Sequence, residues 1–107
     1  MNIDNKISYM ATEEFLMNIV ICDDEKSICA ELENIIKSYA SERKVKIQTD
    51  VFLGGDTLTK YLCREEGPDI IFLDIEIPGY NGVVVGDYIR RVLENEQIFI
   101  IYISSKE

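Results

Sequence analysis

The sequence is poor in cysteine, in basic residues and in long apolar runs, and each shortage removes a class of protein. Its three cysteines, Cys22, Cys29 and Cys63, are too few and too scattered for a disulfide framework or a zinc site. We interpret them as small apolar filler in a reducing cytoplasm. No apolar run approaches the roughly 18 residues of a membrane span, and no signal-peptide pattern opens the chain. The sequence therefore predicts a cytoplasmic protein without a membrane partner.

Basic residues are outnumbered, with 11 Lys and Arg against 20 Asp and Glu, and the net charge is −9. Such a charge repels a phosphate backbone, so we expect no direct nucleic-acid binding by this domain. The 107 residues, 47% of them hydrophobic, suffice for one domain with a sizeable core. We place that domain at residues 17–107. Residues 1–16 show no sustained period and are predicted to form an N-terminal extension or tail, although Thr12 could instead cap a short docking helix.

The apolar patterns predict strands and helices in alternation. Three continuous apolar runs indicate buried strands, and a fourth segment with period two indicates a half-exposed edge strand; these are residues 19–22, 70–73, 98–103 and 45–51. Helical spacing predicts helices over residues 25–40, 56–67 and 83–93, the first with an apolar stripe of Ile28, Leu32, Ile35, Ile36 and Tyr39. Right-handed crossovers between such strands place helices on both faces of the sheet. The expected fold is therefore α/β, with a doubly wound parallel sheet.

Acidic residues follow two of the predicted strands. Asp23 and Asp24 come directly after the first, and Asp74 ends the third, four residues before Pro78 and Gly79 break the chain. Open α/β sheets bind ligands at the carboxyl ends of their strands, so these carboxylates would converge if the strands are neighbours. Converging like charges are costly unless a cation joins them, and oxygen ligands suit Mg²⁺. This pattern predicts metal-assisted handling of a phosphoryl group, although an acidic pair can also simply begin a helix.

Taken together, the acidic pair, Asp74 with Pro78-Gly79, and a final strand ending in Ser104 resemble the response-regulator receiver domain of two-component signalling. Within that family, the segment Leu73-Asp-Ile-Glu-Ile-Pro-Gly79 is similar to receivers that precede LytTR-type DNA-binding domains. The resemblance covers residues 17–107. It implies a flavodoxin-like sheet of strand order 2-1-3-4-5.

The resemblance also implies a role for each residue of the motif. Asp74 matches the phosphoacceptor, which takes a phosphoryl group from a sensor histidine kinase. Asp24 matches the direct Mg²⁺ ligand, Asp23 the second acid, and Glu76 the position whose backbone carbonyl completes the metal shell. Ser104 matches the hydroxyl residue that senses the phosphoryl group and changes the surface that controls an attached or partner output, here transcription.

The sequence departs from the family pattern at its end. Glu107 precedes the family's fourth helix, fifth strand and fifth helix, so the lysine of that fifth strand has no counterpart, and Lys106 is not that residue. The expected sheet is then 2-1-3-4, with Ile98–Ile103 as an exposed apolar edge. We hypothesise self-association through that edge. Competing interpretations are that Tyr9, Met10, Phe15 and Leu16 cover the bare face, or that the sequence is cut short.

Two other function classes fit parts of the pattern. Magnesium-dependent phosphatases also form an aspartyl phosphate at a strand end, but Asp74-Ile-Glu76 fits their motif loosely and 107 residues leave little room for a substrate pocket. A small acidic interaction module without chemistry is the other alternative. We expect a phosphoacceptor signalling domain rather than an enzyme.

Overall fold

The computed structural model describes residues 16–64, 67–77 and 81–104. Within them it contains four strands, β1 (Met17–Cys22), β2 (Ile47–Phe52), β3 (Ile70–Asp74) and β4 (Phe99–Ile103). Three helices alternate with the strands, α2 (Lys26–Glu42), α3 (Gly55–Arg64) and α4 (Gly82–Arg91). Residues 1–15 lie outside the described residues, so the predictions made for the N-terminal extension stay predictions.

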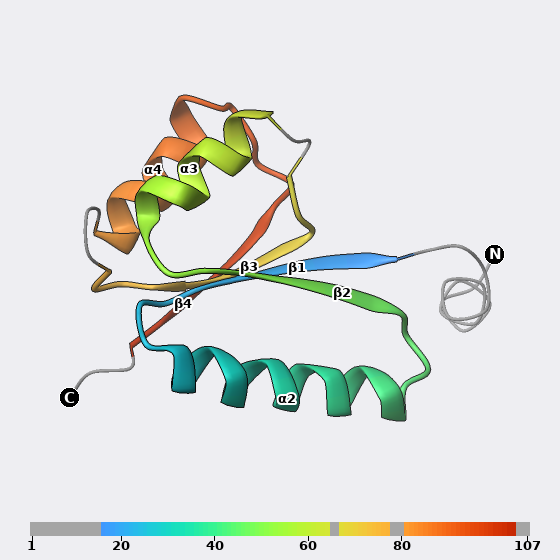
Figure 1. Cartoon of the computed structure of the whole chain (residues 1–107). Coiled ribbons are helices and arrows are strands. Elements are labelled where there is room, and N and C mark those ends of the chain that lie inside the picture. Colours follow the sequence, from blue (N-terminus) through green and yellow to red (C-terminus); the bar gives the residue numbers. More distant parts are fainter. Residues whose placement is uncertain (1–15, 65–66, 78–80, 105–107) are drawn as a thin grey trace, which may run out of the picture.

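The strands form one sheet in the order β2-β1-β3-β4, and every pair is parallel. Figure 1 shows α2 on one face of this sheet and α3 with α4 on the other. The α/β class, the doubly wound arrangement and the predicted 2-1-3-4 order are therefore confirmed. Among the described residues, no helix has the length and apolar character that crossing a membrane would require.

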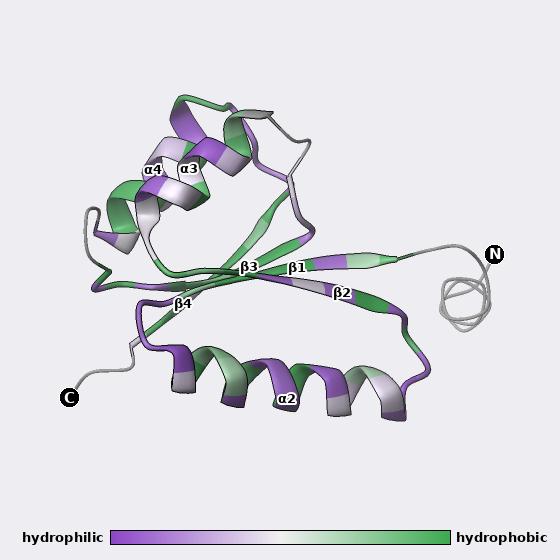
Figure 2. Ribbon diagram, in the orientation of Figure 1, coloured by the Kyte–Doolittle hydropathy of each residue, from purple (hydrophilic) through white to green (hydrophobic). Residues whose placement is uncertain are grey.

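The positions of β1 and β2 follow from their patterns of side chains. The last four residues of β1 are all buried, as expected of a strand with a neighbour on each side and helices on both faces. β2 has no buried residue and lies at a sheet edge, which confirms the prediction from its period of two. β4 differs from the buried strand predicted for residues 98–103, because in the described part of the chain it pairs only with β3 and none of the residues Phe99–Ile103 is buried. In Figure 2, β3 and β4 are green along most of their length, whereas β2 mixes hydrophobic and hydrophilic residues.

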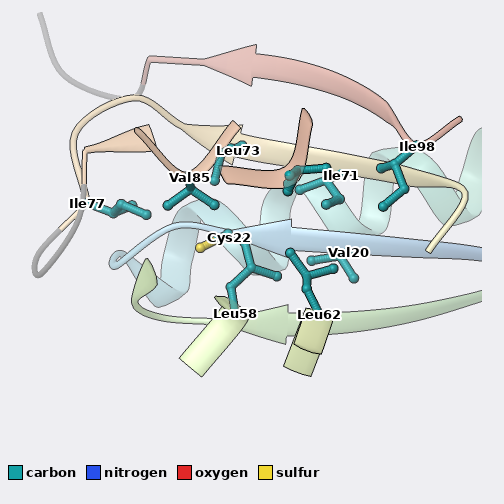
Figure 3. Packing of buried hydrophobic residues seen from close by; sticks show 10 residues of the cluster. Val20, Cys22, Leu58, Leu62, Ile71, Leu73, Ile77, Val85 and Ile98 are labelled. Atoms are coloured by element: carbon teal, nitrogen blue, oxygen red, sulfur yellow. The ribbon is translucent and has the colours of Figure 1, made fainter. Parts of the chain in front are cut away.

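The main hydrophobic core lies between the sheet and the pair α3 and α4. Figure 3 shows side chains of β1 and β3 meeting side chains of α3 and α4, including Val20, Cys22, Leu58, Leu62, Ile71, Leu73 and Val85. Ile98, just before β4, belongs to the same cluster. Both predicted helices of this layer are present, as α3 (Gly55–Arg64) and α4 (Gly82–Arg91). α4 forms despite its run of β-branched residues, because its inward side, which includes Val85 and Ile89, is buried.

Truncating the centre of this core should destabilise the protein strongly. Ile71 is 0% exposed, so Ile71→Ala removes buried methyl groups and leaves a cavity that the surroundings fill only in part. We expect the free energy of unfolding in urea to fall by about 2–5 kcal/mol. Val92→Ala is the control, because Val92 is 64% exposed, and its effect should stay within about 0.5 kcal/mol. Equal losses for the two variants would contradict this placement of the core.

The face covered by α2 is less well packed than its apolar stripe predicts. Only Cys29 and Ala40 of α2 are buried, whereas Ile35 and Tyr39 are 60% and 59% exposed. These two side chains border an apolar groove of about 370 Å³ between α2 and the sheet, whose floor includes Ile19 and Phe72. The predicted apolar stripe is present, but within the described residues the groove beside α2 stays open and leaves Ile35 and Tyr39 exposed.

Candidate functional site

The sheet brings together the three aspartates that follow or end its two central strands. Cys22 of β1 pairs with Leu73 of β3, so the next residues, Asp23 and Asp74, stand side by side at the carboxyl edge. Asp24 follows in the turn that leads into α2. One carboxylate oxygen from each of Asp23, Asp24 and Asp74 lies within 4.8 Å of the other two. The strand register thus produces the convergence that the sequence pattern predicts.

Backbone amides fix two of these carboxylates. Asp23 is 0% exposed and its Oδ1 accepts a hydrogen bond from the Glu25 amide at 2.9 Å. Asp74 is 1% exposed and its Oδ1 accepts a bond from the Glu76 amide at 3.2 Å. In each case the donor lies two residues further along the chain, an arrangement in which aspartate stabilises a turn. The turns therefore hold both side chains at the edge of the sheet before any ligand arrives.

The cluster has the properties of a divalent cation site. Oδ1 of Asp24 is buried and accepts no hydrogen bond from the described residues. A buried carboxylate oxygen without a donor is costly, and three carboxylates this close repel one another. A divalent cation relieves both costs, and a donor set made only of carboxylate oxygens suits Mg²⁺ or Mn²⁺ better than softer metals. The residues present therefore fit the ion that the sequence predicts.

The other two predicted site residues lie at the same edge of the sheet. Glu76 has an exposed side chain and forms an isolated antiparallel bridge with Asn81, across the loop that follows β3. Ser104 follows β4, whose last residue Ile103 pairs with Asp74. Ser104 is exposed and lines a hollow of about 260 Å³ on the α2 side of the sheet. Their predicted roles remain predictions.

Sequence patterns missed two residues beside the cluster. Cys29 is 3% exposed and its thiol donates to the backbone oxygen of Asp23 at 3.4 Å, which joins α2 to the acidic turn. Gly82 begins α4 directly against the backbone of Asp74. The cysteine carried no signal beyond its apolar character. The glycine was visible only as part of the turn signal Tyr80-Asn-Gly82, of which Tyr80 lies outside the described residues.

Burial beside the acidic cluster changes the chemistry of a thiol. Burial, followed by the charges of Cys29 and Asp23, raises the pKa of Cys22 from 9.0 to about 12. The pKa of Cys29 is raised as well, first by burial and then by the charge of Asp23. Both thiols are therefore protonated at neutral pH and poor nucleophiles.

The raised pKa of Cys22 predicts a loss of stability in alkaline solution. Between pH 9 and 12 the unfolded chain releases the Cys22 proton while the folded chain keeps it, so the free energy of unfolding falls as pH rises. One group contributes a slope of up to about 1.4 kcal/mol per pH unit. Urea titrations should show a shallower decline of the free energy of unfolding with pH for Cys22→Ala than for wild type. Identical slopes for wild type and Cys22→Ala would contradict the shift.

Comparison with known proteins identifies the family of the chain. The sequence profile described as "Response regulator receiver domain" matches residues 19–107, a span that includes all three aspartates. The chain belongs to the response regulator receiver domain family. The resemblance drawn from the acidic pair, Asp74 and Ser104 is thereby confirmed, and the receiver domain is a signalling domain of two-component systems.

Curated relatives of this receiver domain are longer proteins. The sensory transduction protein LytT of Oceanobacillus iheyensis is 32% identical over 96 residues, which are 85% of this chain and 35% of LytT. The cyclic di-GMP phosphodiesterase response regulator RpfG of Xanthomonas campestris pv. campestris is 34% identical over 89 residues, 82% of this chain and 22% of RpfG. The chain thus spans about a third or less of these two relatives.

Solved structures share the fold at low sequence identity. The Mn²⁺-bound form of response regulator Rcp1 superposes with a TM-score of 0.72 at 16% identity, covering 85% of this chain and 67% of that one. The BeF₃-activated receiver domain of DrrB superposes with a TM-score of 0.62 at 21% identity, covering 86% and 68%. These likenesses confirm the receiver fold of the described residues.

Proposed function

We propose that the chain is the phosphoacceptor of a two-component phosphorelay, and that Asp74 accepts a phosphoryl group from a sensor histidine kinase. The observation that carries this proposal is the meeting of Asp23, Asp24 and Asp74 within 4.8 Å at the carboxyl edge of the sheet. Support comes from membership of the receiver family. Further support comes from two structural neighbours, the Mn²⁺-bound form of Rcp1 and the BeF₃-activated receiver domain of DrrB.

In the proposed reaction the Asp74 carboxylate acts as the nucleophile. One of its oxygens forms a bond to phosphorus while the bond from phosphorus to the kinase histidine nitrogen breaks, and that electron pair stays on the imidazole. The Glu76 amide holds Oδ1 of Asp74, which fixes the direction in which the carboxylate faces. A nucleophile that is already oriented loses less entropy on reaching the transition state.

The remaining acids prepare the site for the incoming charge. Asp23, Asp24, Asp74 and the Glu76 backbone carbonyl would hold Mg²⁺, which when bound neutralises negative charge on the transferred phosphoryl oxygens. Asp23 is kept in place by the Glu25 amide, so it can hold its position at the edge of β1 whether or not an ion is present.

Ser104 is proposed to report the reaction to the rest of the domain. It follows β4, and the Ile103 carbonyl of that strand accepts a hydrogen bond from the Ile75 amide at 3.0 Å, directly after Asp74. A hydrogen bond from the Ser104 hydroxyl to the phosphoryl group would favour a different packing of this edge. Control of transcription is the output we propose, because relatives include the DNA-binding transcriptional activator EvgA of Escherichia coli K12, 28% identical over 75 residues, which are 70% of this chain and 34% of EvgA.

We also propose that two copies associate through β4, which lies at a sheet edge in the described part of the chain and exposes Phe99 and Tyr102. Sedimentation at micromolar concentration should show a dimer, and Phe99→Lys should shift it to monomer. Val92→Lys is the matched control, because Phe99 and Val92 are both 64% exposed but Val92 lies outside β4. A monomeric wild type would contradict the proposal.

Labelling by a small phosphodonor tests the proposed function against its rivals. With Mg²⁺ and acetyl phosphate, a phosphoacceptor should take up close to one phosphoryl group per chain, whereas a phosphatase should turn over a generic phosphate ester. An interaction module without chemistry should do neither. Absence of label in the presence of Mg²⁺ would therefore overturn the proposal.

A further inference from the structure

The first residue of α4 lies against the main chain of the proposed phosphoacceptor. A Cβ atom added at Gly82 would overlap the carbonyl oxygen of Asp74 and lie 2.9 Å from both the Asp74 carbonyl carbon and the Ile75 Cα. Side-chain Cβ atoms do not approach other carbons so closely. Since the contacted atoms are all backbone, no side-chain rotation could relieve the overlap. Only glycine fits at this position without displacing either α4 or the end of β3.

Hydrogen bonds hold Gly82 in this close contact. Its amide donates to the Ile75 carbonyl at 2.7 Å, and Glu76 bridges to Asn81 next to it. The Asn81 side chain caps α4 by accepting from the Val83 amide at 2.8 Å. The start of α4 is therefore tied to the two residues that follow Asp74.

The backbone of Asp74 is also held on its opposite side. Asp74 pairs with Ile103 of β4, and the Ile75 amide donates to the Ile103 carbonyl at 3.0 Å. The segment from Asp74 to Glu76 thus lies between β4 and Gly82. The direction of this segment sets the positions of two groups. One is the Asp74 carboxylate, which accepts a hydrogen bond from the Glu76 amide, and the other is the Glu76 carbonyl.

We propose that Gly82 is a positioning residue for the divalent cation site. By allowing this close approach, it sets the Asp74 carboxylate and the Glu76 carbonyl at the right distance from Asp23 and Asp24. The inference rests on the proposed function, because it assumes that these groups bind Mg²⁺. Gly82 itself touches neither the ion nor the phosphoryl group. Residues that orient metal ligands typically change metal affinity by about 10–100-fold when they are replaced.

Two glycine substitutions in the same helix test this inference. Gly82→Ala should raise the dissociation constant for Mn²⁺ by about 10–100-fold. Electron paramagnetic resonance of Mn²⁺ measures this constant. Gly86→Ala is the matched control. The nearest atoms to its Cβ would belong to the hydroxyl end of the Tyr102 side chain, which is 44% exposed, so the overlap would fall on a side chain and not on backbone. We expect the control to bind Mn²⁺ within about twofold of wild type.

A second variant separates positioning from a general loosening of α4. Asn81→Ala removes the side-chain cap, keeps the backbone bridge to Glu76 and adds no atom beside Asp74, so it should lower the melting temperature and leave the Mn²⁺ dissociation constant unchanged. A folded Gly82→Ala variant that binds Mn²⁺ as tightly as wild type would overturn the inference. So would an Asn81→Ala variant that loses as much affinity as Gly82→Ala.

The wild-type protein keeps the inference testable if Gly82→Ala does not fold. In a Mg²⁺ titration followed by amide NMR, the Gly82 resonance should shift with the same half-saturation as that of Asp74, while Gly86 stays still. A Gly82 resonance that does not move while Asp74 does would overturn the inference and leave the proposed function standing. A wild-type protein that binds neither Mn²⁺ nor Mg²⁺ would overturn the proposed function and this inference with it.

Discussion

Asp74→Asn is expected to reduce labelling by acetyl phosphate by on the order of 100-fold or more, because the amide oxygen is a much poorer nucleophile than a carboxylate. The substitution preserves shape, and the amide oxygen can still accept the bond from the Glu76 amide. The fold should therefore survive. The label is measured with a radioactive donor in the presence of Mg²⁺ and compared with wild type at equal protein concentration.

Glu96→Gln is the matched control for this experiment. Glu96 is exposed and is not one of the clustered acids, so removing its charge should leave the extent of labelling within about twofold of wild type. Circular dichroism of both variants verifies folding. Undiminished labelling of Asp74→Asn would show that another group accepts the phosphoryl group.

The second large effect concerns Asp24, whose replacement should move metal binding and stability in opposite directions. Asp24→Asn removes one of three carboxylates that lie within 4.8 Å of one another, so the Mg²⁺ dissociation constant should rise by about 10–100-fold. Without metal, however, the variant should be more stable than wild type by on the order of 1–3 kcal/mol, because one repulsive charge is gone. Urea unfolding with EDTA and with Mg²⁺ measures both effects.

Asp50→Asn provides a control for the change in net charge. Asp50, on β2, is half-buried like Asp24, but it is not one of the three clustered aspartates. It should therefore alter neither the Mg²⁺ affinity nor the difference between unfolding in EDTA and in Mg²⁺. If Asp24→Asn destabilised the metal-free protein, a hydrogen bond to Asp24 rather than repulsion within the cluster would dominate its energetics.

The sequence predicted the sheet and the acidic cluster well because both depend on local patterns. Continuous apolar runs mark strands buried on both faces, and the aspartates that follow them must then meet at one edge. The place of Asp23, Asp24 and Asp74 after these strands is therefore enough to predict that they lie together. The half-exposed pattern of residues 45–51 likewise placed β2 at the edge.

Features that depend on contacts between distant segments could not be predicted in the same way. A helical apolar stripe shows which side of α2 faces the sheet, but it does not show whether other side chains cover that side. The exposure of Ile35 and Tyr39 therefore could not be predicted. Gly82 was visible as a turn residue, but its contact with the Asp74 backbone arises only when α4 folds back onto β3. Element ends also differ from the prediction by one to three residues, as at Lys26–Glu42 and Gly55–Arg64, because helix ends depend on capping.

The two faces of the sheet are packed unequally, so they should differ in how many side-chain replacements they tolerate. Side chains between the sheet and the pair α3 and α4 are almost fully enclosed, so few replacements would keep their volume and shape. Within the described residues, Ile35 and Tyr39 border the open groove beside α2, so a change in their size leaves the enclosed core untouched. Sequence drift should therefore accumulate faster on the α2 side, while the strand ends that carry the aspartates remain anchored by the opposite layer.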